Sequence, residues 1–572
     1  MNKIKKKLLY LGGILITIIA CLILIYIICD NEYDRRNNNS HNIEVDSIFE
    51  YDERFWMCLF STEGTFGTEN SDGESKVGLQ ENMIDYTNYW DRATRVINLC
   101  YNNYKNENRM NEQDLEECKE IMENIMATYE RYGYFPRPEY KYANLEYGWV
   151  SAMDAPSIMV AAQCMYEVTM DEKYNRFILD LCKYVVKPTR ENGFNFENGK
   201  EVWPLEYASI NSKDDINEYV LNGSLLGYVC VKAMNGIIKD DAIAEYLEAV
   251  ESTYEKKIEI YRYKNGLWSY YMKGDNVNPM HYVIFEMKLL DAAFYLSDLS
   301  FFKEEREYRS NIVKETMQPF FEETGEGMHY VMLRAGRPNY YLVDCYGTTI
   351  AFFNSKNELI KEDSNTLSGG LLEQKDFYAA MFLEGTVRGA ENYKVYSVMA
   401  DRRYLLFEGK VVSETKESKE EKINVEYDAS YDAVYEENTY NIDAIRDKKL
   451  EGDISVICSE EQELDKIYAL EIDNLQMQTI TPVGIQIWDT SGNGVSRYYT
   501  RIDQGKNLIV FDGSGFVGID ALKNIKQIDV RIYTENLDKE LFFEVGNLYV
   551  FNDSMDYYNY INSSDYHICN GE

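Results

Sequence analysis

Two periodicities of apolar residues divide the chain. Between about 85 and 318, apolar residues recur at spacings of three and four, which is the period of an amphipathic helix. In 114–131, for example, Leu115, Cys118 and Ile121 fall on one stripe. Comparable runs predict helices over 157–170, 172–187, 217–236, 241–260, 281–297 and 302–318. Because Gly- and Asn-bearing breaks separate several of these runs, we expect paired helices stacked around an axis, an α/α toroid at 85–320.

After about 320 the period changes to two. Ile528, Val530 and Ile532 alternate with charged residues, as in a strand that buries one face. We expect a first β-rich domain at 321–435 and a second at 445–555, where short strands separated by turn residues indicate a sandwich or jelly roll. The predicted fold class is therefore multidomain: a mostly α (α/α) toroid followed by all-β sandwich modules, with an N-terminal transmembrane helix.

The N-terminus predicts the compartment. Residues 8–29 carry no charge and follow a cluster of lysines, and about 20 apolar residues span a bilayer. The basic cluster stays inside, so 1–30 is expected to be a single-pass signal anchor in the cell membrane, with a cytoplasmic N-terminus and the rest extracellular. Lipoprotein processing at Cys21 is the alternative, although the run stays apolar beyond it. Residues 31–84 are expected to be a juxtamembrane spacer and entry segment, and 556–572 a tail.

The amino-acid composition limits the kinds of partner that the protein can bind. The 572 residues include 59 Lys and Arg against 97 Asp and Glu, a net charge of −38, which argues against nucleic acid and densely sulfated glycans. The 50 tyrosines are compatible with sugar binding, since phenols stack and form hydrogen bonds. Eleven cysteines without a C-x-x-C pair and only four histidines disfavour a zinc ribbon. Most of the cysteines are expected to be buried small apolar residues.

Aromatic-rich clusters in the helical part resemble the C-terminal domain of D-glucuronyl C5-epimerases. The letters GWVSAM at 148–153 resemble that family's G-W-Y-S-A-M, and WPLEY at 203–207 is similar to its W-Y-E-E-Y. Further matches are YFP at 134–136, YVLNG at 219–223 (family F-V-L-N-G), GLWSY at 266–270 (family G-T-I-Y) and PMHY at 279–282, near the family's Y-H. The order and spacing of these clusters agree with the family over about 132–290.

The resemblance implies a set of site residues. Glu206 and Tyr207 would serve one face of a sugar ring, and Tyr270 or Tyr282 the other; by the motif, Tyr271 is an alternative to Tyr270. Substrate-binding residues would be Trp149, Arg137, Asn222, Lys273 and His281. Lys273 stands near the place of an arginine that the family directs at the uronate carboxylate, and the family's Tyr-His order is reversed at 281–282. The resemblance implies no metal and no organic cofactor.

The chemistry of those residue types agrees with the implied activity. Inverting C5 of a hexuronate removes a proton beside a carboxylate and returns one to the opposite face, which needs two acid–base groups. Donors must also neutralise the charge that develops on the carboxylate. A phenol is a competent proton donor, and burial raises the pKa of a glutamate toward neutrality. The expected partner is therefore a uronate-containing polysaccharide, and a homodimer is compatible with the sequence.

Other interpretations remain open at the level of sequence. A glycoside hydrolase or lyase on the same toroid would use Asp154 and Glu206 as a carboxylate pair. A non-catalytic glycan-binding or export protein would need no acid–base pair at all. Tryptophans such as Trp149 are more often core anchors than sugar platforms, and a histidine at an apolar helix start, such as His281, is more often a satisfied buried residue than a catalytic one.

The C-terminal part contains two further motifs. The G-x-G-x-x-G letters at 513–518 lack the following βαβ unit of a nucleotide site and are interpreted as a loop. Trp488, Tyr498 and Tyr499 are either sugar platforms of a jelly-roll module or core residues.

Overall fold

The computed structural model describes most of the chain beyond residue 42. The described residues are 43–60, 89–105, 110–140, 145–209, 219–262, 269–272, 278, 280–334, 348–365, 380–399, 402–413, 421–423, 425–430, 433–436, 439–442, 450–464, 466–474, 480–495, 498–511, 522–534, 541–552, 554–562 and 566–569. Among them, no helix has both the length and the apolar character needed to cross a bilayer. The predicted anchor at 1–30 and the 513–518 loop lie outside these ranges.

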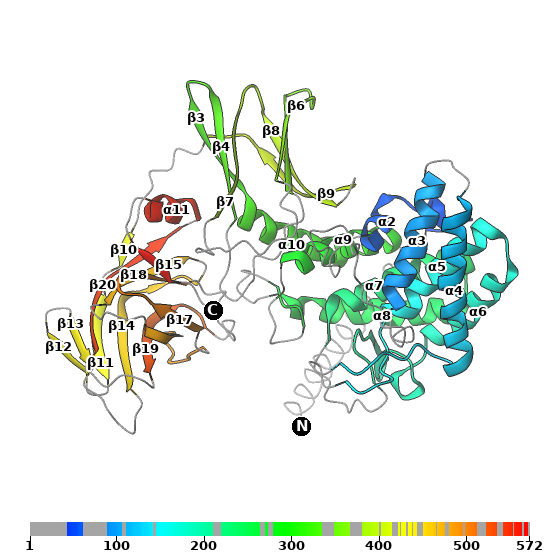
Figure 1. The fold of residues 1–572 in the computed structure, drawn as a ribbon, viewed down its shortest axis with the longest axis horizontal. Helices are drawn as coiled ribbons and strands as arrows, with labels where there is room; N and C mark the ends of the chain where they lie inside the picture. Colours follow the sequence, from blue (N-terminus) through cyan, green and yellow to red (C-terminus); the bar gives the residue numbers. More distant parts are fainter. Residues whose placement is uncertain are drawn as a thin grey trace, which may run out of the picture.

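The helical part consists of consecutive helix pairs, as the three-and-four spacing predicts. Its helices are α3 (Tyr89–Lys105), α4 (Glu112–Tyr132), α5 (Asp154–Thr169), α6 (Glu172–Val185), α7 (Leu221–Ile238), α8 (Asp241–Lys257), α9 (Met280–Ser297) and α10 (Ser300–Met317). Helices α3, α5, α7 and α9 pack against one another in sequence order, and each also contacts the helix that follows it. The helices predicted between 114 and 318 are therefore confirmed, in an arrangement of inner helices that each carry an outer partner (Figure 1).

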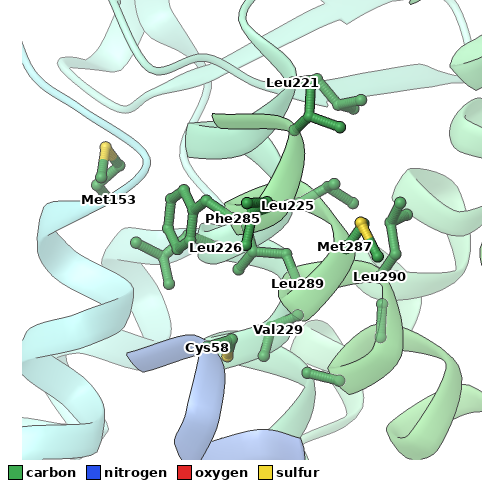
Figure 2. Close-up of a cluster of buried hydrophobic side chains, with 14 of the residues drawn as sticks. Cys58, Met153, Leu221, Leu225, Leu226, Val229, Phe285, Met287, Leu289 and Leu290 are labelled. Atoms are coloured by element: carbon green, nitrogen blue, oxygen red, sulfur yellow. The ribbon is translucent and has the colours of Figure 1, made fainter. Parts of the chain in front are cut away.

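The inner helices α7 and α9 are mostly apolar and mostly buried. Nearly all residues of α7 from Leu221 to Gly236 are buried, which is the pattern of a helix surrounded by protein. In Figure 2, Leu225, Leu226 and Val229 of α7 lie beside Phe285 and Leu289 of α9, in the cluster of side chains that joins the two helices. The two helices therefore form the rigid centre of the helical part.

The predicted spacer is partly wrong. Residues 43–60 include the short helices η1 (Ile48–Glu50) and α2 (Glu53–Phe60), and α2 packs against α9. Ile48 and Phe55 are fully buried, and Tyr51 donates a hydrogen bond to the carbonyl oxygen of Ala233 at 2.6 Å. The closely spaced aromatic residues of this segment belong to the core, because burying them against α7 and α9 removes large apolar surfaces from water.

Two small sheets follow the helices directly. Strands β3 (Pro319–Thr324), β4 (Gly327–Arg334) and β7 (Ala380–Val387) form one sheet, and β5 (Thr348–Phe353), β6 (Leu359–Asn365), β8 (Asn392–Met399) and β9 (Arg402–Lys410) form the other. Strand β9 packs on α10, where Arg306 donates to the Leu405 carbonyl oxygen at 3.0 Å and Ser310 to the Leu406 carbonyl oxygen at 2.8 Å. These bonds join the helical part to the first β region.

The C-terminal part is a sandwich of two sheets. One contains β12 (Ala433–Glu436), β13 (Thr439–Ile442), β20 (Leu541–Phe551), β15 (Ile467–Asn474), β18 (Gly505–Phe511) and β21 (His567–Cys569), with β10 (Glu421–Ile423) paired to β20. The other contains β11 (Val425–Ser430), β14 (Leu450–Gln462), β19 (Ile525–Thr534), β16 (Ile480–Trp488) and β17 (Tyr498–Ile502). Leu470 and Ile485, from opposite sheets, belong to one buried cluster.

Two predicted boundaries of this part need correction. Strands β10 to β13 pair with the sandwich strands, so the sandwich begins by residue 421 and not at 445. Residues 556–572 are not merely a tail, because helix α11 (Ser554–Asn562) buries Tyr557 against this sheet and β21 pairs in parallel with β18. Strand pairing across long sequence separations decides both boundaries, and the local pattern of the chain does not carry that information.

A charged cluster is buried between α9 and α10. The Arg309 guanidinium contacts the Glu286 and Glu305 carboxylates at 2.6 Å each, and all three side chains are almost fully buried. Arg262 contacts Glu305 from the other side at 2.7 Å. Removing one member of a buried ion cluster leaves its partners charged in a poorly solvating environment.

We expect Arg309→Met to lower the free energy of unfolding by about 3–5 kcal/mol, because it strands Glu286 without its cation. Urea denaturation of the full-length chain measures the loss. Lys303→Met is the matched control, since Lys303 and Glu307 are 3.9 Å apart and both 60% exposed, and it should cause no measurable change. Equal stabilities of the two variants would contradict the role assigned to the cluster.

Candidate active site

The segment after β2 carries two of the predicted site residues. Strands β1 (Asn195–Asn198) and β2 (Glu201–Pro204) form a hairpin, and the chain then runs into Glu206 and Tyr207. Backbone hydrogen bonds fix this segment: Ala208 and Val150 exchange bonds of 2.8 and 2.9 Å, and the Ala152 amide donates to the Leu205 carbonyl oxygen at 2.9 Å. Backbone hydrogen bonds therefore join the segments that carry the WPLEY and GWVSAM motifs side by side.

Glu206 is a buried carboxyl group among phenols. Its side chain is 9% exposed, and burial raises its pKa from 4.5 to about 7. The Tyr207 hydroxyl, the positive charge of Arg137, the Gly223 amide and the Tyr271 hydroxyl act in the opposite direction and hold the rise in check. A carboxyl group with a pKa near neutrality exchanges a proton readily with its neighbours, which is the property of a general acid or base.

Helix α7 begins directly against this carboxyl group. Gly223 is the third residue of α7, and a Cβ atom there would lie 2.4 Å from Glu206 Oε2 and 2.7 Å from its Cγ. Only glycine permits this approach. The preceding residue, Asn222, is buried, and its Oδ1 accepts the Gly223 amide at 2.7 Å. The Asn-Gly pair of the YVLNG motif therefore serves to bring a helix N-terminus to Glu206.

Tyr207 is held in a row of aromatic rings. It stacks on Tyr140 with centroids 5.9 Å apart and an interplanar angle of 13°, and it meets Trp149 at 5.6 Å. Trp149 is 5% exposed, and its Nε1 donates to the Pro138 carbonyl oxygen at 2.5 Å. Burial, followed by the charge of Glu206, raises the pKa of Tyr207 above its usual value, so its hydroxyl remains protonated.

Arg137 places a cation beside the carboxyl group. Its guanidinium forms two hydrogen bonds with Asp154, from Nε to Oδ2 at 2.7 Å and from Nη2 to Oδ1 at 2.6 Å, and lies 4.9 Å over the Trp149 ring. Asp154 is 1% exposed. Both oxygens of Asp154 accept hydrogen bonds from Arg137, so this carboxylate serves to hold the guanidinium, which disfavours the Asp154–Glu206 hydrolase pair.

The third tyrosine beside Glu206 is Tyr271. The Tyr271 phenol interacts with both Glu206 and Tyr207, and burial, followed by these neighbours, raises its pKa. Tyr282, on α9, stacks on the Tyr271 ring with centroids 5.0 Å apart and an angle of 20°, and His281 meets the Tyr282 ring at 4.2 Å. Tyr270 instead belongs to the hydrophobic core and is 8% exposed. Adjacent residues of an extended segment face opposite sides, which separates Tyr270 from Tyr271.

Three inner helices start at this site. Asp154 is the first residue of α5, Gly223 the third of α7 and Tyr282 the third of α9. Contacts through Arg137, Glu206 and Tyr271 connect these helix starts. Helix N-termini carry partial positive charge, so the site can stabilise negative charge on a bound group.

The remaining predicted groups have mixed outcomes. Lys273 lies outside the described residues. Trp488, in the sandwich, is half-buried and donates from Nε1 to Asp529 Oδ2 at 2.6 Å, and the side chains of Tyr498 and Tyr499 lie outside the described part.

Within the described ranges, no group of three His, Cys, Asp or Glu side chains is arranged to hold a metal ion. Sequence reasoning missed Tyr140, and its only local signal is its position in the aromatic-rich stretch before Trp149.

Sequence comparison gives one family match. Residues 127–311 match the family model described as D-glucuronyl C5-epimerase C-terminus. This range contains every described group of the candidate active site. No curated protein sequence matches the chain.

Comparison with solved structures gives only distant similarities. The crystal structure of an agarase, AgWH50C, has 12% identity and a TM-score of 0.18, covering 24% of each chain. The Lin0763 protein from Listeria innocua has 10% identity and a TM-score of 0.28, covering 49% of this chain and 73% of its own. PfGH50B has 13% identity and a TM-score of 0.18, covering 23% of this chain and 22% of its own, so this chain spans about a fifth of the length of that protein. TM-scores this low carry no argument about fold or function.

The raised pKa of Glu206 makes stability depend on pH. The folded state binds the proton more tightly than the unfolded state, so the contribution is complete below pH 4.5 and is lost as the pH rises through about 7. The loss amounts to about 3 kcal/mol. Urea denaturation at a series of pH values should show wild type losing this much stability relative to Glu206→Gln between those limits. Parallel pH curves for the two proteins would contradict the assignment.

Proposed function

Because residues 127–311 belong to the D-glucuronyl C5-epimerase C-terminal family, we propose that the protein inverts C5 of D-glucuronate residues to L-iduronate in a polysaccharide. The observation that carries the proposal is the buried Glu206 carboxyl group, whose pKa is about 7 and which interacts with the phenols of Tyr207 and Tyr271. An epimerase needs acid–base groups on both faces of the ring, and these three residues provide them.

The reaction proceeds by two proton transfers. The Tyr207 and Tyr271 hydroxyls are hydrogen-bonded to each other. For the reaction, the uronate ring must separate them and take one phenol on each face. The C5–H bond breaks, the proton passes to the Glu206–Tyr207 pair with Glu206 as its final holder, and the electron pair delocalises into the substrate carboxylate. The Tyr271 hydroxyl then gives its proton to the opposite face of C5. Proton transfer from Glu206 back to the Tyr271 phenolate restores both groups.

Charge stabilisation comes from Arg137 and the helix starts. Electron density moves onto the substrate carboxylate as C5 loses its proton, so donors and positive charge near the ring lower the barrier. Arg137, oriented by Asp154, and the amide end of α7 at Gly223 supply positive potential beside Glu206. Arg137 thus has the role that the resemblance gave to an arginine near Tyr271. Tyr282 acts as a positioning residue through its stack on the Tyr271 ring.

The cellular setting and overall architecture extend this proposal. An anchor at 1–30 would hold the enzyme at the outer face of the cell membrane, where a surface or exported polysaccharide is accessible. The row of inner helices, each with an outer partner, supports closure into an α/α toroid. The chain's net charge of −38 favours an unsulfated glycan as the substrate.

We expect the full-length chain, incubated in D2O with an unsulfated glucuronate-containing polysaccharide, to incorporate deuterium at C5 and to produce iduronate without shortening the polymer. Proton NMR measures both. Glu206→Gln, Tyr207→Phe and Tyr271→Phe should each lower the exchange rate by at least about 100-fold, because each removes a transferable proton. The appearance of new reducing ends would instead identify the protein as a hydrolase, and the appearance of unsaturated uronates would identify it as a lyase.

The matched control is Tyr270→Phe. Tyr270 precedes Tyr271 but packs in the core, so loss of its hydroxyl should change the exchange rate far less than loss of the Tyr271 hydroxyl. A stronger effect of Tyr270→Phe than of Tyr271→Phe would overturn the assignment of the third tyrosine.

Gly223→Ala should also lower the exchange rate by about 100-fold. The new Cβ would lie only 2.4 Å from Glu206 Oε2 and would displace the carboxyl group, and a displacement of about 1 Å in a catalytic group costs a factor of this size. Gly325→Ala, in the β3–β4 turn, is the control because a Cβ there meets no atom within 4 Å. An active Gly223→Ala enzyme would show that the close approach of α7 is not needed for catalysis.

A further inference from the structure

A pocket lies on the segment that leads into the candidate active site. It encloses about 150 Å³ between the β1–β2 hairpin, residue 219, the C-terminal end of α8 and the short helix η5 (Ile258–Tyr261). Its aromatic walls are Phe196, Trp203, Tyr219 and Tyr261. None of the residues that line it belongs to the Glu206 cluster. We call it the Trp203 pocket.

The aromatic walls hold one another in place. Trp203 stacks on Tyr261 with centroids 6.0 Å apart and an angle of 20°, and it meets Tyr219 edge-on at 5.6 Å. Phe196 meets Tyr219 edge-on at 5.8 Å, and the Tyr261 hydroxyl donates to the Tyr219 carbonyl oxygen at 2.8 Å. A cavity of about this size accommodates one six-membered ring. The Trp203 pocket is therefore a preformed site for one ring.

Polar groups stand at the edge of these walls. Lys257 and Glu201 form an ion pair at 2.5 Å, with side chains 39% and 31% exposed. Among the described residues, the buried Trp203 Nε1 has no hydrogen-bond acceptor. Aromatic walls with a few charged and donating groups are typical of small-molecule sites. They match a sugar ring, which presents an apolar C–H face to aromatic rings and hydroxyls to polar groups. Trp203 and Tyr261 are buried behind the pocket, and the half-buried rings of Phe196 and Tyr219 are the ones that a ligand can contact.

The chain connection keeps the pocket close to Glu206. Trp203 lies three residues before Glu206, so their Cα atoms are at most about 11 Å apart. Tyr219 lies four residues before Gly223, which abuts Glu206. A polysaccharide that presents one ring to Glu206 has further rings of the same chain within reach of the pocket.

We propose that the Trp203 pocket binds a second sugar residue of the polysaccharide whose uronate lies at Glu206. Lys257 pairs with a carboxylate of the glycan, Glu201 accepts hydroxyl groups, and the half-buried rings of Phe196 and Tyr219 contact the sugar ring. The identity of the glycan rests on the proposed function, whereas the capacity to hold a sugar rests on the pocket itself. The protein therefore recognises a stretch of polymer and not a single uronate.

Calorimetric titration tests the inference. The full-length chain is titrated with unsulfated oligosaccharides of alternating glucuronate and N-acetylglucosamine, from disaccharide to decasaccharide, and affinity should rise with length. Lys257→Gln should lower the affinity for the decasaccharide about tenfold, the effect of losing one hydrogen bond to a charged group. Ile260→Trp, at a 38% exposed position lining the pocket, should cause a similar loss by filling it.

Lys183→Gln is the matched control, because Lys183 also pairs with a carboxylate, Asp180 at 3.0 Å, but on the surface of α6. It should bind every oligosaccharide as wild type does. The inference would be overturned if Lys257→Gln and Ile260→Trp both bound the decasaccharide with an affinity within twofold of wild type. It would also be overturned if wild type bound none of the oligosaccharides. Weaker binding by the pocket variants without any C5 exchange in D2O would retain the pocket and reject the epimerase. C5 exchange in D2O together with wild-type oligosaccharide affinity in both pocket variants would retain the epimerase and reject the pocket as a sugar site.

Discussion

The contact between the start of α7 and the Glu206 carboxyl group determines the geometry of the candidate active site. Because Gly223 has no Cβ, the helix backbone approaches the carboxyl group more closely than any other residue would allow. The carboxyl group is consequently buried, and burial raises its pKa toward neutrality while the helix amide and Arg137 limit the rise. A more exposed Glu206 would be an ordinary ionised glutamate. A deeper one without these partners would be permanently protonated.

The rigidity of that contact comes from the core behind it. Helix α7 is buried along most of its length and packs against the mostly buried α9, so their N-termini have little freedom to move apart (Figure 2). The ion cluster around Arg309 ties α9 to α10, and α2 covers α9 from the N-terminal side. Catalytic geometry of this kind requires a supporting shell that fixes each side chain, and the inner helices supply it.

The aromatic groups of the site come from segments that are far apart in sequence. Tyr140 and Trp149 lie between α4 and α5, Tyr207 follows β2 and Tyr271 precedes α9, yet ring contacts and hydrogen bonds join them around Glu206. The motifs gave the residue types, because an aromatic cluster beside a glutamate in a helical domain is an unusual pattern. They left Tyr270 and Tyr271 equivalent. The side-chain alternation of the extended segment at 269–272 decides between them, with Tyr270 in the core and Tyr271 beside the carboxyl group.

The sequence by itself determined the helices between 114 and 318, the change to strands after about 320 and the membership of Glu206, Tyr207 and Trp149 in one motif-rich region. The helices and strands follow from local periodicity, which any short window of the chain displays. The grouping of the three site residues follows from the resemblance of their motifs to the epimerase family. Tertiary structure alone decided that residues 43–60 enter the core, that β10 to β13 join the C-terminal sandwich and that Arg137 pairs with Asp154. Each of these depends on partners distant in sequence, and the free energy gained by burial or pairing is set by the partner and not by the segment.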